Sequence, residues 1–191
     1  MPRLKIVVGG SARGVGKTSL VCGLIAAMRE HSWTAVKITS HAHQGRDSIY
    51  EEKGAGTDRR GDTFRYLRAG AARSFLVTAD EGNSPVGLIS TGLGAAQDIL
   101  IETTRFAGDF KPDLCIGVLG DASTPMKESF RPFLLRADAL VVRTDHEVRL
   151  DGIPSGIPVF RLGALDQISP EMLEWLWPLM IKARTRGLVR A

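Results

Sequence analysis

A glycine-rich stretch near the N-terminus has the residue types and the spacing to bind phosphate. It follows an apolar run rich in β-branched residues, 4–8, and precedes a helical pattern at 18–30. Backbone N–H groups backed by a helix N-terminus converge on an anion, and glycines let the chain approach it closely. In such a loop the lysine reaches the β- and γ-phosphates, and the hydroxyl that follows it holds Mg²⁺. We therefore expect Mg²⁺ and a nucleoside triphosphate to bind at Gly10, Ser11, Ala12, Arg13, Gly14, Val15, Gly16, Lys17, Thr18 and Ser19.

The spacing of this loop differs from the common pattern G-x-x-x-x-G-K-[ST]. Ser11 stands at the first glycine position, and Gly10 comes one residue earlier. The longer spacing resembles that of dethiobiotin synthetase and the cobyrinate amide synthetases. Some relatives carry a second lysine near the start of the loop, which acts across a dimer. Ala12 and Arg13 stand there in this chain, so that lysine is absent, and Arg13 either takes a similar role or faces solvent.

A carboxylate at the end of a neighbouring strand would complete the Mg²⁺ site. A buried strand pattern at 98–102 ends at Glu102, and a carboxylate there orients Mg²⁺ directly or through water. We expect Lys17, Thr18 and Glu102 to carry the chemistry, with Thr18 and Glu102 as the Mg²⁺ ligands. A helix cap or a surface carboxylate is the alternative for Glu102. The next candidates, each of which follows a strand pattern, are Asp80 and Asp121.

Apolar strand patterns alternate with helical patterns along the chain. This alternation predicts an α/β fold of the P-loop NTPase type, with a mostly parallel sheet of about seven strands between two layers of helices. Ligands of such sheets bind beyond the carboxyl ends of the strands. Residues 40–61 have no periodicity, and a loop of that length is usually functional. The expected strands are 4–8, 35–39, 74–78, 99–102, 114–119, 139–143 and 159–162. The expected helices are 18–30, 62–71, 124–136 with a bend at Pro132, and one that opens at Ser169-Pro170 with a kink at Pro178.

Two later stretches, taken with the phosphate loop, resemble the family of molybdopterin-guanine dinucleotide biosynthesis protein B. In that family a Lys-His-x-His-His stretch follows the second strand. A helix with the pattern G-x-D-[ST]-x-R-x-x-x-A-G-A comes later, and Val-Glu-Gly ends a later strand. The resemblance covers residues 4–105, although Thr103 stands where the family has glycine. The matching residues are Lys37, His41, His43, Asp62, Thr63, Arg65, Ala69, Gly70, Ala71 and Glu102.

This resemblance implies a GTP-binding accessory protein for molybdenum cofactor maturation, in a fold class that includes metallochaperone GTPases. Its second ligand would be molybdopterin or another anionic small molecule. The residues alone leave three roles open for His41 and His43: metal ligands, phosphate or pterin contacts, or part of a solvated loop, and two ligands make no metal site. Asp62 is equally a helix N-cap. The expected second-ligand contacts are Lys37, His41, His43, Asp62, Thr63 and Arg65.

A short stretch after the sixth expected strand resembles part of a guanine-binding motif. Guanine-specific proteins of this class carry Asn-Lys-x-Asp, whose aspartate accepts two hydrogen bonds from guanine. Val142, Arg143 and Asp145 stand at the Asn, Lys and Asp positions. An arginine stem can pack on a base as a lysine stem does. We expect Arg143 and Asp145 to contact the base, with GTP favoured over ATP, and a charged loop is the alternative.

Length, charge and composition limit the remaining possibilities. The 191 residues suit one domain, 1–191. A net charge of +4 is spread along the chain, so anionic small molecules are expected as ligands and nucleic acid is not. No apolar run reaches the length of a membrane span. Two cysteines without a C-x-x-C pattern predict a reduced, cytoplasmic compartment.

Three functions stay open on the sequence. The first is Mg²⁺-dependent binding and slow hydrolysis of GTP or ATP by an accessory protein of molybdopterin cofactor maturation. No general base is evident, so turnover of the isolated protein is expected below about 1 s⁻¹. The second is an ATP-dependent ligase or kinase of the dethiobiotin synthetase type, in which Lys37 holds a carboxylate or carbamate. The third is a nucleotide-switched adaptor or metallochaperone GTPase, with Trp175 and Trp177 in a partner surface or in the core. A protein partner and a homodimer stay open.

Overall fold

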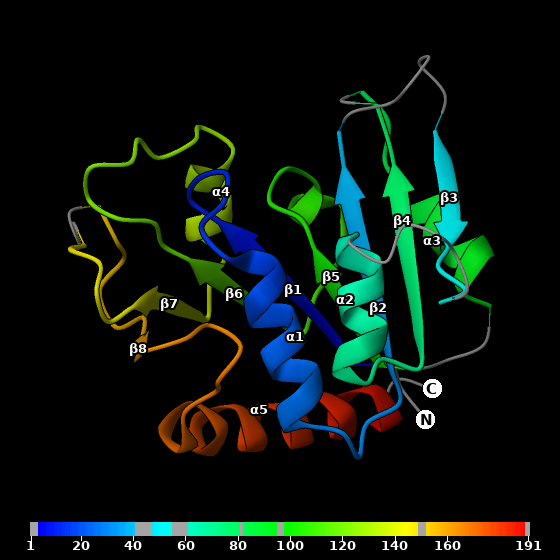
Figure 1. Ribbon diagram of the computed structural model, residues 1–191. Helices are drawn as coiled ribbons and strands as arrows, with labels where there is room; N and C mark the ends of the chain where they lie inside the picture. Colours follow the sequence, from blue (N-terminus) through cyan, green and yellow to red (C-terminus); the bar gives the residue numbers. More distant parts are fainter. Residues whose placement is uncertain are drawn as a thin grey trace.

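An eight-stranded sheet forms the centre of the computed structural model, which describes residues 4–40, 47–54, 61–80, 82–94, 98–148 and 152–189. The strand order is β3-β4-β2-β5-β1-β6-β7-β8 (Figure 1). Every neighbouring pair is parallel except β3 with β4. The fold is therefore the predicted α/β class with one strand more than expected. The strands are β1 (Lys5–Gly10), β2 (Trp33–Thr39), β3 (Ser48–Glu51), β4 (Arg73–Thr78), β5 (Asp98–Glu102), β6 (Leu114–Val118), β7 (Ala139–Arg143) and β8 (Val159–Leu162).

The additional strand, β3, lies inside the segment that the sequence predicts as a loop, so that prediction is wrong for residues 48–51. It pairs antiparallel with β4, with Ser48 opposite Thr78. Its four residues alternate between exposed and half-buried positions, and Ile49 meets helix α3 (Val86–Leu93) at Gly92. Four residues are too few for alternation to stand out in a sequence, and the strand depends on its partner for hydrogen bonds.

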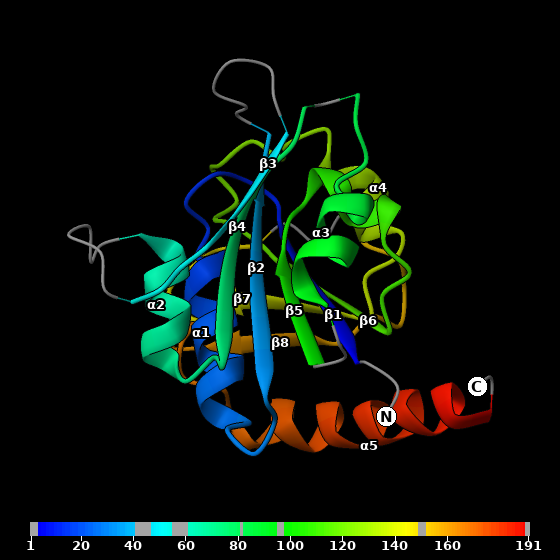
Figure 2. The same ribbon diagram turned by 90° about the vertical axis from the view of Figure 1, so that its right-hand side faces the viewer.

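Helices cover both faces of the sheet, as predicted (Figure 2). The helices α1 (Lys17–Ala27), α2 (Asp62–Ala69) and α5 (Pro170–Val189) pack on one face. The other face carries α3, the short 3₁₀ helix η2 (Arg105–Asp109) and α4 (Phe130–Leu134). Successive strand residues point to opposite faces, so Ile6 and Val8 enter one core and Val7 the other.

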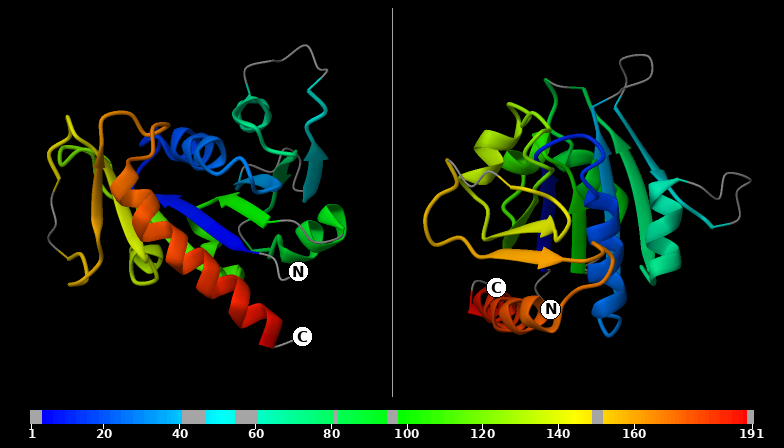
Figure 3. Two further views of the ribbon diagram at one scale, coloured as in Figure 1. Left: turned by 90° about the horizontal axis from the view of Figure 1, so that it is seen from below. Right: turned by 60° about the vertical axis from the view of Figure 1, so that its left-hand side comes forward.

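Two helix predictions need correction. The helix expected at 124–136 is only α4, because prolines at 125 and 132 restrict it and residues 119–129 form turns instead. One of those turns binds the phosphate loop, as described below. In contrast, α5 runs through Pro178 as one helix, which Figure 3 shows as a single rod. None of the helices among the described residues is both long and apolar enough to cross a membrane.

The sheet register places three chemically important positions side by side. Val8 of β1 lies opposite Glu102 of β5, and Lys37 of β2 lies opposite the same glutamate. All three strands are parallel, so their carboxyl ends open at one edge of the sheet. The glycine-rich loop leaves β1 at this edge and enters α1 there (Figure 1).

Candidate nucleotide-binding site

The glycine-rich loop adopts a backbone that only glycine accepts easily. Gly14 and Gly16 have φ angles of 75° and 97°, in the left-handed region where a side chain is strained. A Cβ atom on Gly16 would lie 2.2 Å from Leu165 Cδ1, and one on Gly10 would lie 2.8 Å from Lys17 Cγ. The Lys17 side chain therefore folds back over the start of the loop, as a lysine that grips phosphate would have to do.

The start of the loop is fixed to neighbouring strands and turns. The Ser11 amide donates to the Val118 carbonyl at 2.9 Å, and the Lys127 amide donates to the Ser11 carbonyl at 2.8 Å. The Ser11 hydroxyl accepts from the Gly120 amide at 2.8 Å, and the Gly10 amide donates to Thr104 Oγ1 at 2.9 Å. The serine that departs from the common motif thus ties the loop to the turn after β6.

The other side chains of the loop are either buried in the core or exposed to solvent. Ala12 and Val15 are buried in the core below the loop. Arg13 is exposed, and its guanidinium makes no hydrogen bond or ion pair with the residues that the structure describes. Any ligand of this loop would accordingly meet amide groups, the Lys17 ammonium and the hydroxyls of Thr18 and Ser19.

Glu102 is the centre of the site below the loop. Its side chain is only 4% exposed. The Thr18 hydroxyl donates to Oε2 at 2.7 Å, and the Tyr66 hydroxyl donates to the same oxygen. Burial raises the pKa of Tyr66 well above its usual value, and the Glu102 charge adds to the shift, so the phenol stays protonated and donates. Lys37 Nζ lies 3.2 Å from Oε1, which leaves the carboxylate fully partnered.

A second carboxylate, Asp62, shares the Lys37 ammonium with Glu102. The Lys37 ammonium donates to Asp62 Oδ2, and Arg65 Nη1 lies 3.5 Å from Oδ1. Burial alone would raise the pKa of Asp62, but the hydrogen bond and charge of Lys37 outweigh it and lower that pKa. Burial likewise opposes the charge on Lys37, yet Glu102 and Asp62 raise its pKa. The three groups form one ionised cluster.

The pKa of Lys17 shifts in the opposite direction from that of Lys37. Burial lowers the pKa of Lys17, and the charges of Lys127 and Lys37 lower it further, while Glu102 opposes the shift. Its ammonium has no hydrogen bond or ion pair with any described residue. Like charges gathered around an unpartnered buried ammonium favour an anion there. Sequence analysis missed Lys127 and Tyr66, because both reach the site only through the fold.

The residues expected to contact a second ligand separate into two groups. The structure brings Lys37 and Asp62 to the loop, and Arg65 Nη2 donates to Ser19 Oγ at 3.0 Å. Thr63 instead faces Glu52, with 3.4 Å between Thr63 Oγ1 and Glu52 Oε2. His41 and His43 lie outside the described residues. Asp62 directly follows Gly61, the N-cap of α2, whose cap position makes no side-chain hydrogen bond.

The two alternative carboxylates, Asp80 and Asp121, sit in turns. Asp121 accepts from the Ser123 amide and hydroxyl at 3.0 and 2.7 Å. The Ser123 hydrogen bonds lower the pKa of Asp121. Asp80 follows β4, where its amide donates to Asp47 Oδ1 at 2.9 Å. Glu102 is the carboxylate that Thr18 contacts.

The residues expected to contact a base lie just beyond β7. The Arg143 guanidinium donates to both Asp145 oxygens, at 2.9 and 2.5 Å, and this hydrogen bonding lowers the pKa of Asp145. Both side chains are exposed. The loop after β8, residues 163–165, lies against the phosphate loop through the Leu165 contact with Gly16. The sequence analysis missed this loop, which has no motif of its own.

The described parts of the chain contain neither a metal-binding cluster nor a reactive cysteine. Within them, no group of three or more His, Cys, Asp or Glu residues is placed to hold a metal ion. Both cysteines are free thiols. Burial raises the pKa of Cys22 to about 11 and that of Cys115 to about 12, so neither is a reactive thiolate at neutral pH.

In this mostly parallel sheet a glycine-rich loop joins an inner strand to its helix, and a carboxylate stands on the adjacent strand. This arrangement is the fold of the P-loop NTPases. No protein-family model matches the sequence, and no curated protein matches it. HypB from Helicobacter pylori, solved in complex with nickel, has a similar fold, with a TM-score of 0.57 and 16% identity over 96% of this chain and 89% of that one. Two structures of Bacillus subtilis MobB match with TM-scores of 0.44 and 0.45, at 17% and 20% identity, over 92% and 91% of this chain and 96% of each of theirs. At 16% identity the similarity to HypB shows a shared fold alone.

Proposed function

We propose that the protein binds a nucleoside triphosphate with Mg²⁺ and hydrolyses it slowly. The observation that carries the proposal is the hydrogen bond of 2.7 Å from Thr18 to the buried Glu102, directly below the phosphate loop. Thr18 Oγ1 is also within hydrogen-bonding reach of Asp62 and Tyr66, so a cation at this hydroxyl would meet the carboxylates of Glu102 and Asp62. The folded-back Lys17 supplies the positive charge on the other side.

The oxygen donors around Thr18 suit Mg²⁺, which prefers carboxylate and hydroxyl oxygens with several waters. Thr18 and Glu102 would hold the ion, and the structure adds Asp62 as a third oxygen donor. The site already gathers a cation between the two carboxylates, because the Lys37 ammonium contacts both. When bound, Mg²⁺ would neutralise charge on the β- and γ-phosphates.

The chain's own groups account for slow turnover. Loop amides and the Lys17 ammonium would stabilise negative charge that develops on the transferred phosphoryl group. Catalysis of this reaction depends on such stabilisation and on an oriented water. Among the described residues, no carboxylate or histidine at the loop is without partners and placed to orient that water. Turnover below about 1 s⁻¹ by the isolated protein is therefore expected.

We favour GTP over ATP on the basis of Asp145. Its carboxylate lies on the loop after β7, next to the loop after β8 that borders Gly16. In the free protein Arg143 satisfies both oxygens, so a guanine would have to replace that pairing. The Arg143 stem would then pack on the base.

We place this activity in molybdopterin cofactor maturation, as an accessory protein, on the strength of the sequence resemblance over residues 4–105. Lys37 and Arg65 supply positive charge beside the loop for molybdopterin or another anionic second ligand. The second candidate is an ATP-dependent ligase or kinase of the dethiobiotin synthetase type. The observation that favours it is the position of Lys37, whose ammonium sits within the Thr18–Glu102 cluster where it could hold a carboxylate or carbamate.

Thermal unfolding with ATP, GTP and molybdopterin, each with and without Mg²⁺, tests these proposals together. A ligand at about 100 times its Kd adds roughly 2.7 kcal/mol to the folded state. We expect a nucleotide to stabilise the protein only when Mg²⁺ is present. Lys17→Ala should lose this stabilisation, and the matched control Lys111→Ala should keep it. Stabilisation by molybdopterin supports the pathway. Nucleoside diphosphate release that a small acceptor stimulates would instead support the ligase or kinase.

A further inference from the structure

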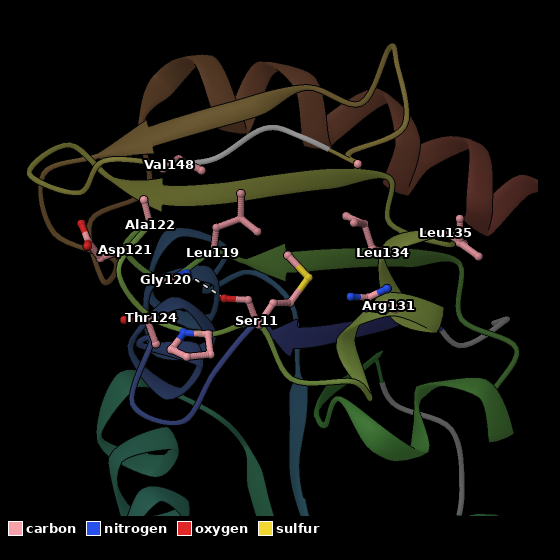
Figure 4. Close-up of a pocket in the computed structure, with 13 residues that line it drawn as sticks. Ser11, Leu119, Gly120, Asp121, Ala122, Thr124, Arg131, Leu134, Leu135 and Val148 are labelled. Atoms are coloured by element: carbon pink, nitrogen blue, oxygen red, sulfur yellow. Dashed lines mark hydrogen bonds between the residues drawn. The ribbon is translucent and has the colours of Figure 1, made fainter.

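A cavity of about 570 Å³ lies beside the phosphate loop, on the side of the sheet that α4 covers. Figure 4 shows Ser11 and Arg131 on one side of it, with Leu119 and Leu134 above them. The volume falls within the range of roughly 300–1,000 Å³ that small-molecule sites occupy. The cavity shares Ser11 with the phosphate loop, but the Ser11 amide donates to the Val118 carbonyl, so the phosphate contacts proposed above do not use this space.

The cavity combines apolar walls with one available positive charge. Leu119, Met126, Leu134 and Val148 supply the apolar surface. The guanidinium of Arg131 makes no hydrogen bond or ion pair with any residue that the structure describes. Arg131 is exposed, so a carboxylate would pair with it at the solvent-accessible edge of the cavity, where two parallel N–H groups match the two carboxylate oxygens.

The carboxylate of Asp121 does not cancel this charge. It lies at the far end of the cavity from Arg131 (Figure 4). Its oxygens already accept from the Ser123 amide and hydroxyl and from the Glu147 amide. Asp121 is the one carboxylate among the described lining residues, and it does not pair with Arg131.

Ser11 connects this cavity to the phosphate loop. Its hydroxyl accepts from the Gly120 amide at 2.8 Å, and its carbonyl accepts from the Lys127 amide at 2.8 Å. The wall formed by residues 119–126 is therefore held by the same residue that begins the loop. A molecule in the cavity would lie next to a bound nucleotide without needing the amides that grip its phosphates.

We propose that this cavity binds a small organic carboxylate with an apolar body, whose charge pairs with Arg131. The binding does not depend on the proposed nucleotide function. Only its role as a second ligand beside a bound nucleotide rests on the proposed function. The two ideas therefore fail separately.

The test uses 4-phenylbutyrate and its uncharged counterpart 4-phenylbutanol, titrated by calorimetry and by NMR of leucine and valine methyl groups. We expect the carboxylate to bind about tenfold more tightly than the alcohol, as a charge-assisted pair allows. The shifted methyl signals should be those of Leu119, Leu134 and Val148. Arg131→Met should abolish the difference between the two probes, and Arg131→Lys should retain part of it. Arg68→Met, an exposed arginine on α2, should change nothing.

Three results would overturn the proposal. The first is no binding of the carboxylate at about 10 mM, which is weaker than a millimolar site. The second is equal affinity for both probes, or a preference that survives Arg131→Met. The third is displacement of the carboxylate by Mg²⁺-nucleotide, which would make the cavity part of the nucleotide site. Failure of nucleotide binding in the thermal experiments, with the carboxylate still bound, would remove the proposed function and leave this site standing.

Discussion

Replacing Lys37 by methionine removes the cation that holds two carboxylates together. Asp62 and Glu102 both contact its ammonium. Methionine has nearly the length of lysine without the charge, so the change removes the ion pairs while it keeps most of the volume. Glu102 would retain its hydrogen bonds from Thr18 and Tyr66, but the two carboxylates would lose the charge that balances them.

The expected cost follows from burial. Breaking a fully buried pair costs about 3–5 kcal/mol because an uncompensated charge remains. The side chains of Lys37, Asp62 and Glu102 are 24%, 33% and 4% exposed, so water screens part of the Asp62 charge and little of the Glu102 charge. We expect a loss of about 2–3 kcal/mol at pH 7, which for a chain of this size lowers Tm by roughly 5–10 °C.

The cost should depend on pH in a defined direction. Asp62 has a lowered pKa, so its stabilising contribution is present above its unfolded pKa of about 4 and disappears as pH falls through the folded pKa. Lys37 has a raised pKa, so its contribution is complete below about 10.4 and disappears as pH rises through the folded pKa. The difference between Lys37→Met and the natural sequence should therefore be largest between these limits.

Urea unfolding of Lys37→Met, Asp62→Asn and the double variant would measure the coupling. We expect Asp62→Asn to recover part of the Lys37→Met loss but less than half of it, because it removes the more exposed of the two unbalanced charges and leaves Glu102. The control is Lys53→Met, since Lys53 is 73% exposed and 3.4 Å from Glu51 and should matter by less than about 0.5 kcal/mol. A loss no greater than the control's, or no recovery in the double variant, would refute the reasoning.

Three further perturbations test the loop and its surroundings. Gly16→Ala should lower the free energy of unfolding in urea by about 2 kcal/mol or more, because the new side chain adds left-handed backbone strain and overlaps Leu165. Gly14→Ala has nothing near its Cβ atom and should cost only the strain. Equal losses in the two variants would contradict the overlap. Tyr66→Phe should cost about 1.5–3 kcal/mol, since a buried carboxylate loses a donor, while Tyr50→Phe at an exposed position should be neutral. Iodoacetamide at pH 8 should alkylate Cys22 about a hundredfold more slowly in the folded protein than in the urea-unfolded protein. The reason is that burial raises the pKa of Cys22 from 9.0 to about 11. Similar rates would show that the thiol is not shielded.

The parts of the site that the sequence predicts are those whose signal is contiguous. The phosphate loop occupies one stretch with a strand before it and a helix after it, so each residue's place follows from its neighbours. Glu102 ends an apolar run that the sequence predicts as a buried strand, and β5 ends at that residue. Lys37 ends a strand in the same way, and parallel pairing then brings the three ends to one edge.

The parts that the sequence does not predict depend on contacts between distant segments. Tyr66 reads as a helix residue, and only the packing of α2 against α1 turns its hydroxyl toward Glu102. Lys127 reads as part of a helix, yet the turn after β6 presents its amide to Ser11. The strand β3 exists because β4 has a free edge there. No spacing within the sequence encodes these approaches.

The hydrogen bonds around Glu102 explain why the loop would accept a cation as well as phosphate. Oε2 takes hydrogens from both Thr18 and Tyr66, so neither hydroxyl hydrogen is directed at the loop. Thr18 directly follows Lys17 at the start of α1, so a hydroxyl, a carboxylate and an ammonium lie at one end of the loop. That set of groups suits a cation next to an oxyanion. Because the one Lys37 ammonium pairs with both carboxylates, its displacement or its pairing with a ligand anion would link occupancy of this space to the position of α2.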